Sequence, residues 1–130
     1  MDLKIYGNAA HLNGFTISCI GMSVISNSAW FNIAAIRNLD LKEGHRILFG
    51  CDEKTNSWYF TYGFEIENGT KLRNESNNTN SLRCSCKRVA HLICEKAKST
   101  SITCAISKKP KIINGRPWYN ILTATPLRVK

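Results

Sequence analysis

Two segments of the chain show the same order of residue types at a fixed separation of 53 positions. Residues 28–39 read SAWFNIAAIRNL and residues 81–92 read SLRCSCKRVAHL. Beyond Asn32 and Ser85, apolar residues follow at three-residue steps that line one face of a helix. Asn and Ser both accept hydrogen bonds from free backbone N–H groups, so each is expected to cap its helix. The pattern predicts two copies of one unit, with chance similarity of two amphipathic segments as the alternative.

Strand-like segments surround both predicted helices, and a Trp-Tyr pair recurs at Trp58 and Trp118. A turn-forming segment precedes each pair. The expected strands are residues 15–19, 46–49 and 57–60 in the first copy and 70–73, 101–106 and 117–120 in the second. The prediction is an α+β fold with antiparallel sheets and two short helices. Residues 1–130 would form a single domain of two tandem strand-(strand)-helix-strand-strand repeats, at about 14–64 and about 69–125.

The length of 130 residues is enough for one domain with its own core. No stretch approaches the roughly 18 apolar residues of a membrane span. The N-terminal Met1–Ile5 is also too polar for a signal peptide. We therefore expect a cytoplasmic protein with no membrane partner, whose six cysteines are free thiols, mostly at apolar positions.

Catalytic and metal-binding patterns find little support. Cys84, Cys86, His91 and Cys94 lie close together in the sequence, but they lack the paired Cys-x-x-Cys spacing of structural zinc sites. The three histidines fall outside the metalloprotease, nucleophile-elbow and phosphate-loop motifs. The sequence therefore predicts no catalytic residues, no metal and no cofactor, and a protein that is not an enzyme.

Positive charge is concentrated in the second half of the chain. Residues 1–70 contain 5 Lys/Arg against 7 Asp/Glu, whereas residues 71–130 contain 13 against 2. Clustered Lys and Arg side chains bind polyphosphate by displacing its condensed counterions. Period-two spacing predicts that Lys71 and Arg73 project from one side of a strand. The candidate phosphate-binding residues are Lys71, Arg73, Arg83, Lys87, Arg88, Lys108, Lys109, Lys111 and Arg116.

Aromatic residues accompany these basic segments. Exposed rings stack on unpaired bases, with about 1–3 kcal/mol for each stacked base. Trp58 and Trp118 are the candidate stacking residues, and Trp58 belongs to a period-two stripe with Phe60 and Tyr62. Packing in the core is the alternative role for these rings, and the sequence does not choose between the two.

The run from Phe31 to Ile47, FNIAAIRNLDLKEGHRI, resembles the swapped-hairpin motif of AbrB-type transcription regulators. In that motif a strand, a short helix, an L-x-L-x-x-G-D turn and a second strand follow in order. Asp40 stands where those proteins usually have Gly, His45 where they usually have Asp, and Asn32 where a proline commonly precedes the helix. The resemblance implies a dimeric regulator of double-stranded DNA, with Arg37 and Arg46 near the DNA or the interface.

The chain as a whole is similar to a group of small proteins from phages and mobile elements of gut bacteria. The shared motifs are an F-N-x-A-A helix start, a W-Y hairpin, a K-L-R strand and a late W-Y strand. From Arg46 to Ala97, four expected strands precede a helix. This order resembles the positive-coactivator and Whirly folds, which implies a curved sheet that binds single-stranded DNA.

Together these features predict a non-enzymatic nucleic-acid-binding protein from a phage or mobile element, with single-stranded DNA as the expected ligand. An AbrB-like duplex-binding regulator is one alternative. A phage module that inhibits a host factor through an acidic protein surface is another, because a basic surface also steers protein association. A homodimer could form through strand edges at Leu3–Tyr6 or Ile121–Thr123.

Overall fold

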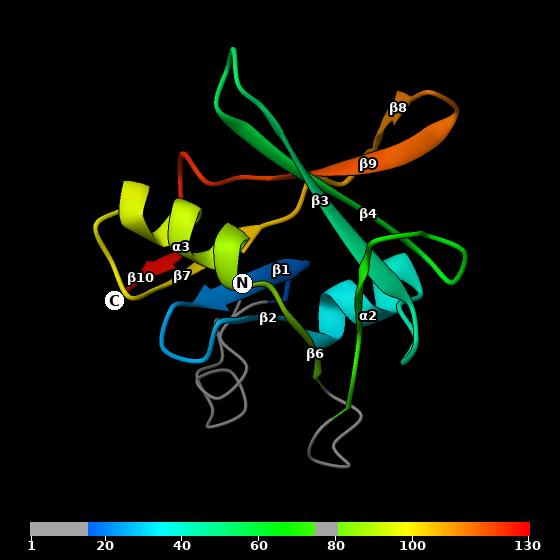
Figure 1. The fold of residues 1–130 in the computed structure, drawn as a ribbon, viewed down its shortest axis with the longest axis horizontal. Coiled ribbons are helices and arrows are strands. Elements are labelled where there is room, and N and C mark those ends of the chain that lie inside the picture. The colour runs from blue at the N-terminus through cyan, green and yellow to red at the C-terminus, as the bar shows by residue number, and fades with distance from the viewer. Residues whose placement is uncertain (1–15, 75–80) are drawn as a thin grey trace, which may run out of the picture.

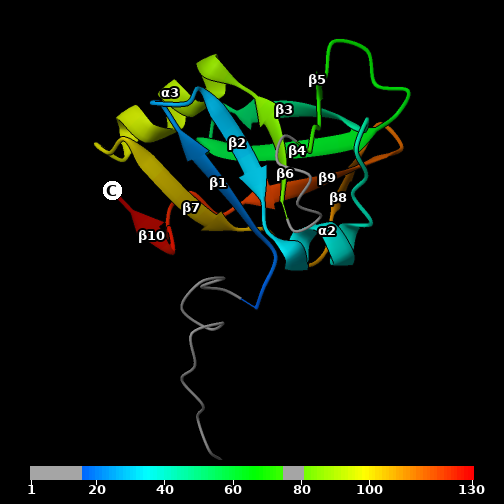
Figure 2. The ribbon, with the colours of Figure 1, turned by 90° about the horizontal axis from the view of Figure 1, so that it is seen from below.

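Antiparallel strands dominate the computed structural model, which describes residues 16–74 and 81–130 (Figures 1 and 2). Within these residues the chain is a mixed α+β protein with two five-stranded sheets and two helices. The first sheet has the order β10 (Arg128–Val129), β7 (Ser101–Ala105), β1 (Cys19–Ser23), β2 (Ser28–Phe31) and β6 (Leu82–Ser85). The second has the order β5 (Thr70–Lys71), β3 (Arg46–Asp52), β4 (Ser57–Gly63), β9 (Arg116–Ile121) and β8 (Lys111–Ile113).

Two isolated bridges join these sheets into a ring. Just beyond β5, Arg73 pairs with Arg83 of β6 through two backbone hydrogen bonds of 2.8 and 3.0 Å. On the opposite side, Ile106 at the end of β7 pairs with Ile121 of β9. The resulting ring has the order β6-β2-β1-β7-β9-β4-β3-β5, with β8 and β10 attached outside it. Ring closure gives the edge strands partners and so limits exposed backbone.

The interior of the ring is filled by alternate residues of its strands. Phe31 and Phe60 are both fully buried, and their ring centroids lie 5.3 Å apart, so the core connects the two sheets. In β6, for example, the buried Leu82 and Cys84 lie on either side of the outward Arg83. This alternation is the period-two pattern of a strand with one buried face. The outward residues are therefore the ones available to a ligand.

The first helix, α2 (Ile33–Leu39), begins as the sequence predicts. Asn32 is its N-cap, and the side-chain Oδ1 accepts hydrogen bonds from the N–H groups of Ala35 at 2.9 Å and Cys19 at 3.0 Å. One side chain thus caps the helix and ties it to the start of β1.

The prediction that Ser85 caps the second helix is wrong. The N-cap of α3 (Lys87–Lys96) is Cys86, which makes no side-chain capping bond. Ser85 is still part of β6, where it pairs with Ser28, and its hydroxyl accepts a hydrogen bond from Arg73. The extra strand residue delays the helix by one position. Ala90, Ile93 and Cys94 of α3 are buried, and the helix packs on β1 and β2.

Most predicted strands coincide with β3, β4, β5, β7 and β9, but the first strand is misplaced. β1 covers residues 19–23 and not 15–19. The proposed edge at Ile121 is also wrong, because Ile121 pairs with Trp58 and bridges Ile106. Leu3–Tyr6 lies outside the described residues. Neither helix of the described part of the chain is long and apolar enough to cross a bilayer.

The C-terminus of α2 yields a stability prediction. Asp40 follows the helix in the left-handed conformation, with φ 52° and ψ 46°. Side chains with a Cβ are strained there, whereas Gly is not. Asp40→Gly should raise the free energy of unfolding by about 0.5–1 kcal/mol, and Asp40→Ala should lower it by a similar amount. Urea denaturation of both variants tests this; a more stable Ala variant would contradict it.

Candidate nucleic-acid interface

Four cations meet where the two sheets join at β5 and β6. Arg46 of β3 pairs with Lys71 of β5, and Arg73 pairs with Arg83 of β6. Lys71 and Arg73 are exposed on either side of the fully buried Leu72, as their period-two spacing predicts. We call Arg46, Lys71, Arg73 and Arg83 the basic joint. The ring thus brings cations from three strands to one outward surface.

Trp30 extends the basic joint across the first sheet. Trp30 of β2 pairs with Arg83 on one side and with Gly21 of β1 on the other. The guanidinium carbon of Arg83 lies 5.4 Å from the centroid of the indole, which is cation–π geometry. The indole lies over Gly21, where an added Cβ would overlap it. Arg83 and Gly21 together hold the half-buried ring at the surface.

Hydrogen bonds fix the two central arginines. Arg73 Nη2 donates to Ser85 Oγ at 3.1 Å, and Arg83 Nη1 donates to Ser28 Oγ at 3.0 Å. Because Ser28 and Ser85 are themselves paired across β2 and β6, both guanidinium groups are held against one patch of the sheet. Guanidinium groups that are already positioned in this way can make charge-assisted hydrogen bonds to an anion.

A shallow groove of about 330 Å³ lies over the second sheet. Its walls include Tyr59, Lys111 and Trp118, and Lys111 pairs with Trp118 across β8 and β9. The indole of Trp118 lies over Gly50, where an added Cβ would come within 3.2 Å of Cζ3. This second surface tryptophan therefore also lies beside a cation.

Trp58 and Trp118 are on opposite faces of the second sheet. Trp58 packs against the hydrophobic core and pairs with Ile121. Phe60 pairs with Tyr119, which puts Tyr119 on the inner face and its neighbour Trp118 on the outer one. Trp58 of the first Trp-Tyr pair therefore shares a face with Tyr119, and not Trp118, of the second pair. A one-residue difference along a strand is enough to place a side chain on the opposite face. Both rings are half-buried, but Trp118 faces outward, whereas Trp58 packs against the core.

The remaining predicted cations are distributed over other surfaces. Lys87 and Arg88 are exposed in the first turn of α3. Lys108 and Lys109 are exposed between β7 and β8. Arg116 Nη2 donates to Glu65 Oε1 at 2.9 Å, so its charge is partly compensated.

In the sequence, Arg46 is placed near DNA only by the AbrB resemblance and not among the candidate phosphate-binding residues, and Trp30 is not indicated as an aromatic component at all. The 53-residue offset aligns Trp30 with Arg83, which suggests replacement of one by the other. In the structure these two residues lie side by side, because β2 pairs with β6. Only the strand order carries that information.

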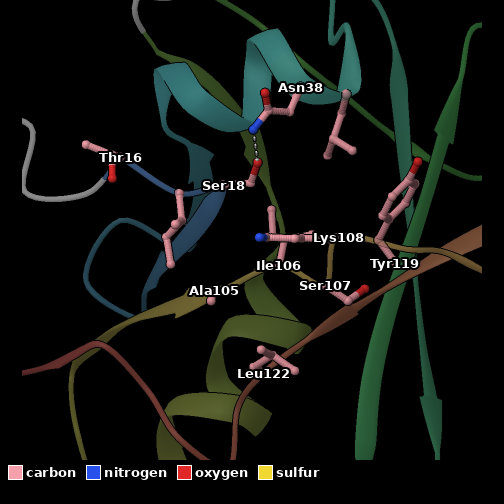
Figure 3. A pocket seen from close by; sticks show the side chains of 11 residues that line it. Thr16, Ser18, Asn38, Ala105, Ile106, Ser107, Lys108, Tyr119 and Leu122 are labelled. Carbon is pink, nitrogen blue, oxygen red and sulfur yellow. Dashed lines mark hydrogen bonds between the residues drawn. The ribbon is translucent and has the colours of Figure 1, made fainter.

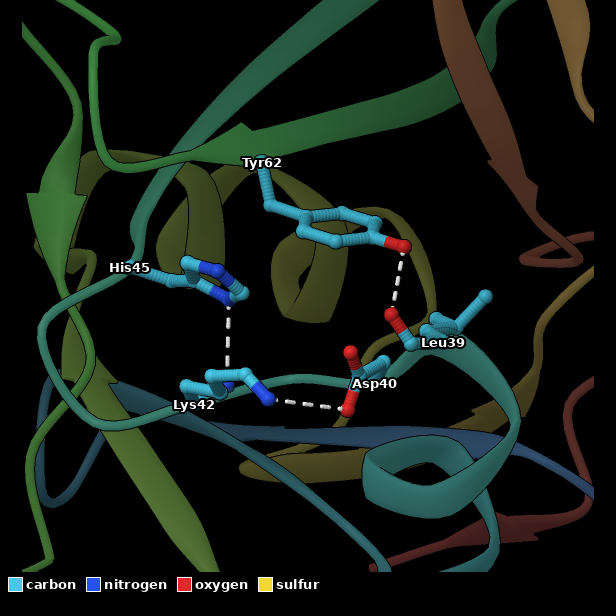
Figure 4. A network of polar contacts seen from close by, with 5 residues as sticks. All are labelled: Leu39, Asp40, Lys42, His45 and Tyr62. Atoms are coloured by element: carbon cyan, nitrogen blue, oxygen red, sulfur yellow. Dashed lines mark hydrogen bonds and ion pairs between the residues drawn. The ribbon is translucent and has the colours of Figure 1, made fainter.

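A polar network behind the joint positions its strands (Figure 4). The imidazole of His45 is buried, and its Nδ1 accepts a hydrogen bond from the backbone N–H of Lys42 at 3.0 Å. The carbonyl of His45 accepts from the N–H of Leu72 at 2.8 Å, between Lys71 and Arg73. His45 therefore helps to fix β5 beside β3.

Tyr62 completes this network. Its hydroxyl donates to the carbonyl of Leu39 at 2.6 Å, and its ring centroid lies 5.5 Å from that of His45. Burial, together with Tyr119, raises the pKa of Tyr62 to about 12, so the hydroxyl stays protonated at neutral pH. The tyrosine acts as a hydrogen-bond donor that holds the end of α2.

All six cysteines are free thiols, and only Cys51 is exposed. Burial raises the pKa of Cys19 to about 11 and that of Cys104 to about 12. A hydrogen bond with Cys86, together with burial, raises the pKa of Cys84. Protonated buried thiols are poor nucleophiles, so Cys19, Cys84 and Cys104 act as small core residues.

His91 and the cysteines near it do not converge on a metal site. His91 Nε2 lies 2.9 Å from Asn27 Oδ1, within hydrogen-bond distance. No group of three His, Cys, Asp or Glu residues within residues 16–74 and 81–130 is arranged to hold a metal ion.

No family model, curated protein or solved structure matches the chain.

The buried imidazole predicts a pH-dependent stability. Burial, with the nearby Lys42 ammonium, lowers the pKa of His45 from its ordinary 6.5. Between the lowered pKa and 6.5 the unfolded chain binds more protons than the folded chain, so stability is lost as pH falls below about 6.5. Urea denaturation at pH 7.5 and 5.5 should show lower stability at pH 5.5.

The matched control is His91→Gln, which removes a surface imidazole. This variant should keep the pH dependence, whereas His45→Gln should lose most of it while being less stable at pH 7.5. Equal stability of the unmodified protein at both pH values would contradict the assignment.

Proposed function

We propose that the chain is a non-enzymatic protein that binds single-stranded nucleic acid, with DNA as the favoured ligand, across the basic joint and Trp30. The arrangement of Arg73, Arg83 and Trp30 in one cross-strand row carries this proposal. Two fixed guanidinium groups offer donors to phosphate, and the neighbouring indole offers a face to a base.

Preference for a single strand follows from the aromatic component. Bases in a duplex stack on each other and hide their faces, whereas an unpaired base can stack on a protein ring. Trp30 is half-buried beside Arg83, and Trp118 is half-buried beside Lys111. Contacts between the side chains of Arg46 and Lys71 and the phosphates of the nucleic acid would add affinity without sequence preference.

We also propose that the two halves of the chain are copies of one unit. The pairing of β1 with β7 has its counterpart in the pairing of β5 with β3, and that of β3 with β4 in the bridge between β7 and β9. The central pairing, β2 with β6, sets Trp30 opposite Arg83, which are equivalent at the 53-residue offset. A pseudo-twofold axis through this pair would pass through the middle of the proposed binding surface.

Removal of the two central arginines gives the direct test. Arg73→Gln/Arg83→Gln should weaken binding of a labelled oligothymidylate. The slope of log affinity against log salt should become shallower by about 0.7 for each lost phosphate contact. Fluorescence anisotropy over a salt series measures both quantities, and circular dichroism checks that the variant is folded.

Lys96→Gln/Lys98→Gln is the matched control, because it removes the same charge from exposed positions at the end of α3. Its affinity and salt slope should stay near those of the unmodified protein. If both double variants lost the same affinity, the loss would reflect net charge alone, and the proposal would be overturned.

Competition by unlabelled duplex separates the proposal from the AbrB-like alternative. Single strands should displace the probe at lower concentration than a duplex of the same length. A clear duplex preference would favour the regulator, and no binding at low salt would favour a protein partner.

A further inference from the structure

A second site lies where β7 and β9 meet, on the side of the ring opposite the basic joint. A pocket of about 660 Å³ opens between α2, the residues before β1, the end of β7 and the strand β9 (Figure 3). It is next to the bridge between Ile106 and Ile121. Its volume falls within the range of about 300–1,000 Å³ typical of small-molecule sites.

The walls of this pocket are mainly apolar. Ile17, Leu39, Ile106 and Leu122 contribute aliphatic groups, and Tyr119 contributes an aromatic ring. Ile17 is 44% exposed and Leu122 is 37% exposed, so both present apolar area that a ligand could cover. Removal of such area from water is the main driving force for binding an apolar group.

Among the described residues that line the pocket, Lys108 is the only charged one. Its ammonium group points into the pocket (Figure 3). Several nearby polar side chains already have partners, because Asn38 Nδ2 donates to Ser18 Oγ at 2.9 Å and the Ser107 hydroxyl donates to the carbonyl of Lys109 at 3.2 Å. An entering ligand would therefore find one cationic group within an apolar surface.

We propose that this pocket binds a small amphipathic carboxylate, with its apolar body against the aliphatic walls and its carboxylate on the Lys108 ammonium. The ammonium–carboxylate contact is a charge-assisted hydrogen bond, which orients the ligand. Lys108 thus has a role separate from the nucleic-acid surface. The site does not depend on the proposed nucleic-acid binding.

Isothermal titration calorimetry of the full chain with decanoate, kept below its critical micelle concentration, tests this site. Decanoate should bind saturably at one equivalent, and decylammonium of the same chain length should bind at least about tenfold more weakly. Lys108→Met keeps the length of the side chain and should weaken decanoate binding by about tenfold, the effect expected for a lost charged hydrogen bond. The matched variant Lys109→Met should leave the affinity unchanged.

A pocket-filling variant provides the second arm. Ala105 lines the pocket, so Ala105→Leu should reduce decanoate binding while oligothymidylate binding persists. Equal affinity for decanoate and decylammonium, or equal effects of the Lys108 and Lys109 substitutions, would overturn the proposal. The absence of saturable decanoate binding would do the same, and none of these results would change the outcome for the Arg73 and Arg83 variants.

Discussion

The backbone pairing between Arg73 and Arg83 is the constraint from which the surface of this protein follows. Their two hydrogen bonds of 2.8 and 3.0 Å join β5 to β6 and so connect the edge of one sheet to the edge of the other. Without this pairing both edges would present unsatisfied N–H and C=O groups. The same pairing sets two guanidinium groups side by side on the outside of the ring.

This arrangement has an energetic consequence for function. The serine hydrogen bonds and the Arg83–Trp30 contact hold the two guanidinium groups in place. Fixed guanidinium groups lose little conformational entropy when they bind an anion. A cationic surface that is already ordered is suited to a phosphate ligand.

The sequence predicts the local elements well and their lateral arrangement poorly. Helical spacing after Asn32 and alternation in β3, β4 and β7 identify those elements, because both patterns are local. The order of strands in the ring depends on contacts between residues far apart in the chain. For this reason Trp30 is absent from the sequence-based site and Arg46 enters it only through the AbrB resemblance, although each is next to a predicted cation.

Register explains the errors at single residues. A Trp-Tyr pair occurs in both halves, but a one-residue difference places Trp58 on the inner face of the sheet, against the core, and Trp118 on the outer face. Ser85 resembles Asn32 in sequence, yet β6 continues through Ser85 and Cys86 takes the cap position. Small shifts of this kind alter the face of a strand without altering its composition.

Chemical-shift mapping with a short oligothymidylate would show whether the basic joint and Trp30 form one binding surface. We expect the backbone amides of Arg46, Arg73 and Arg83 and the indole N–H of Trp30 to shift together as the oligonucleotide is added. Shifts confined to α3, or the absence of shifts at low salt, would contradict it.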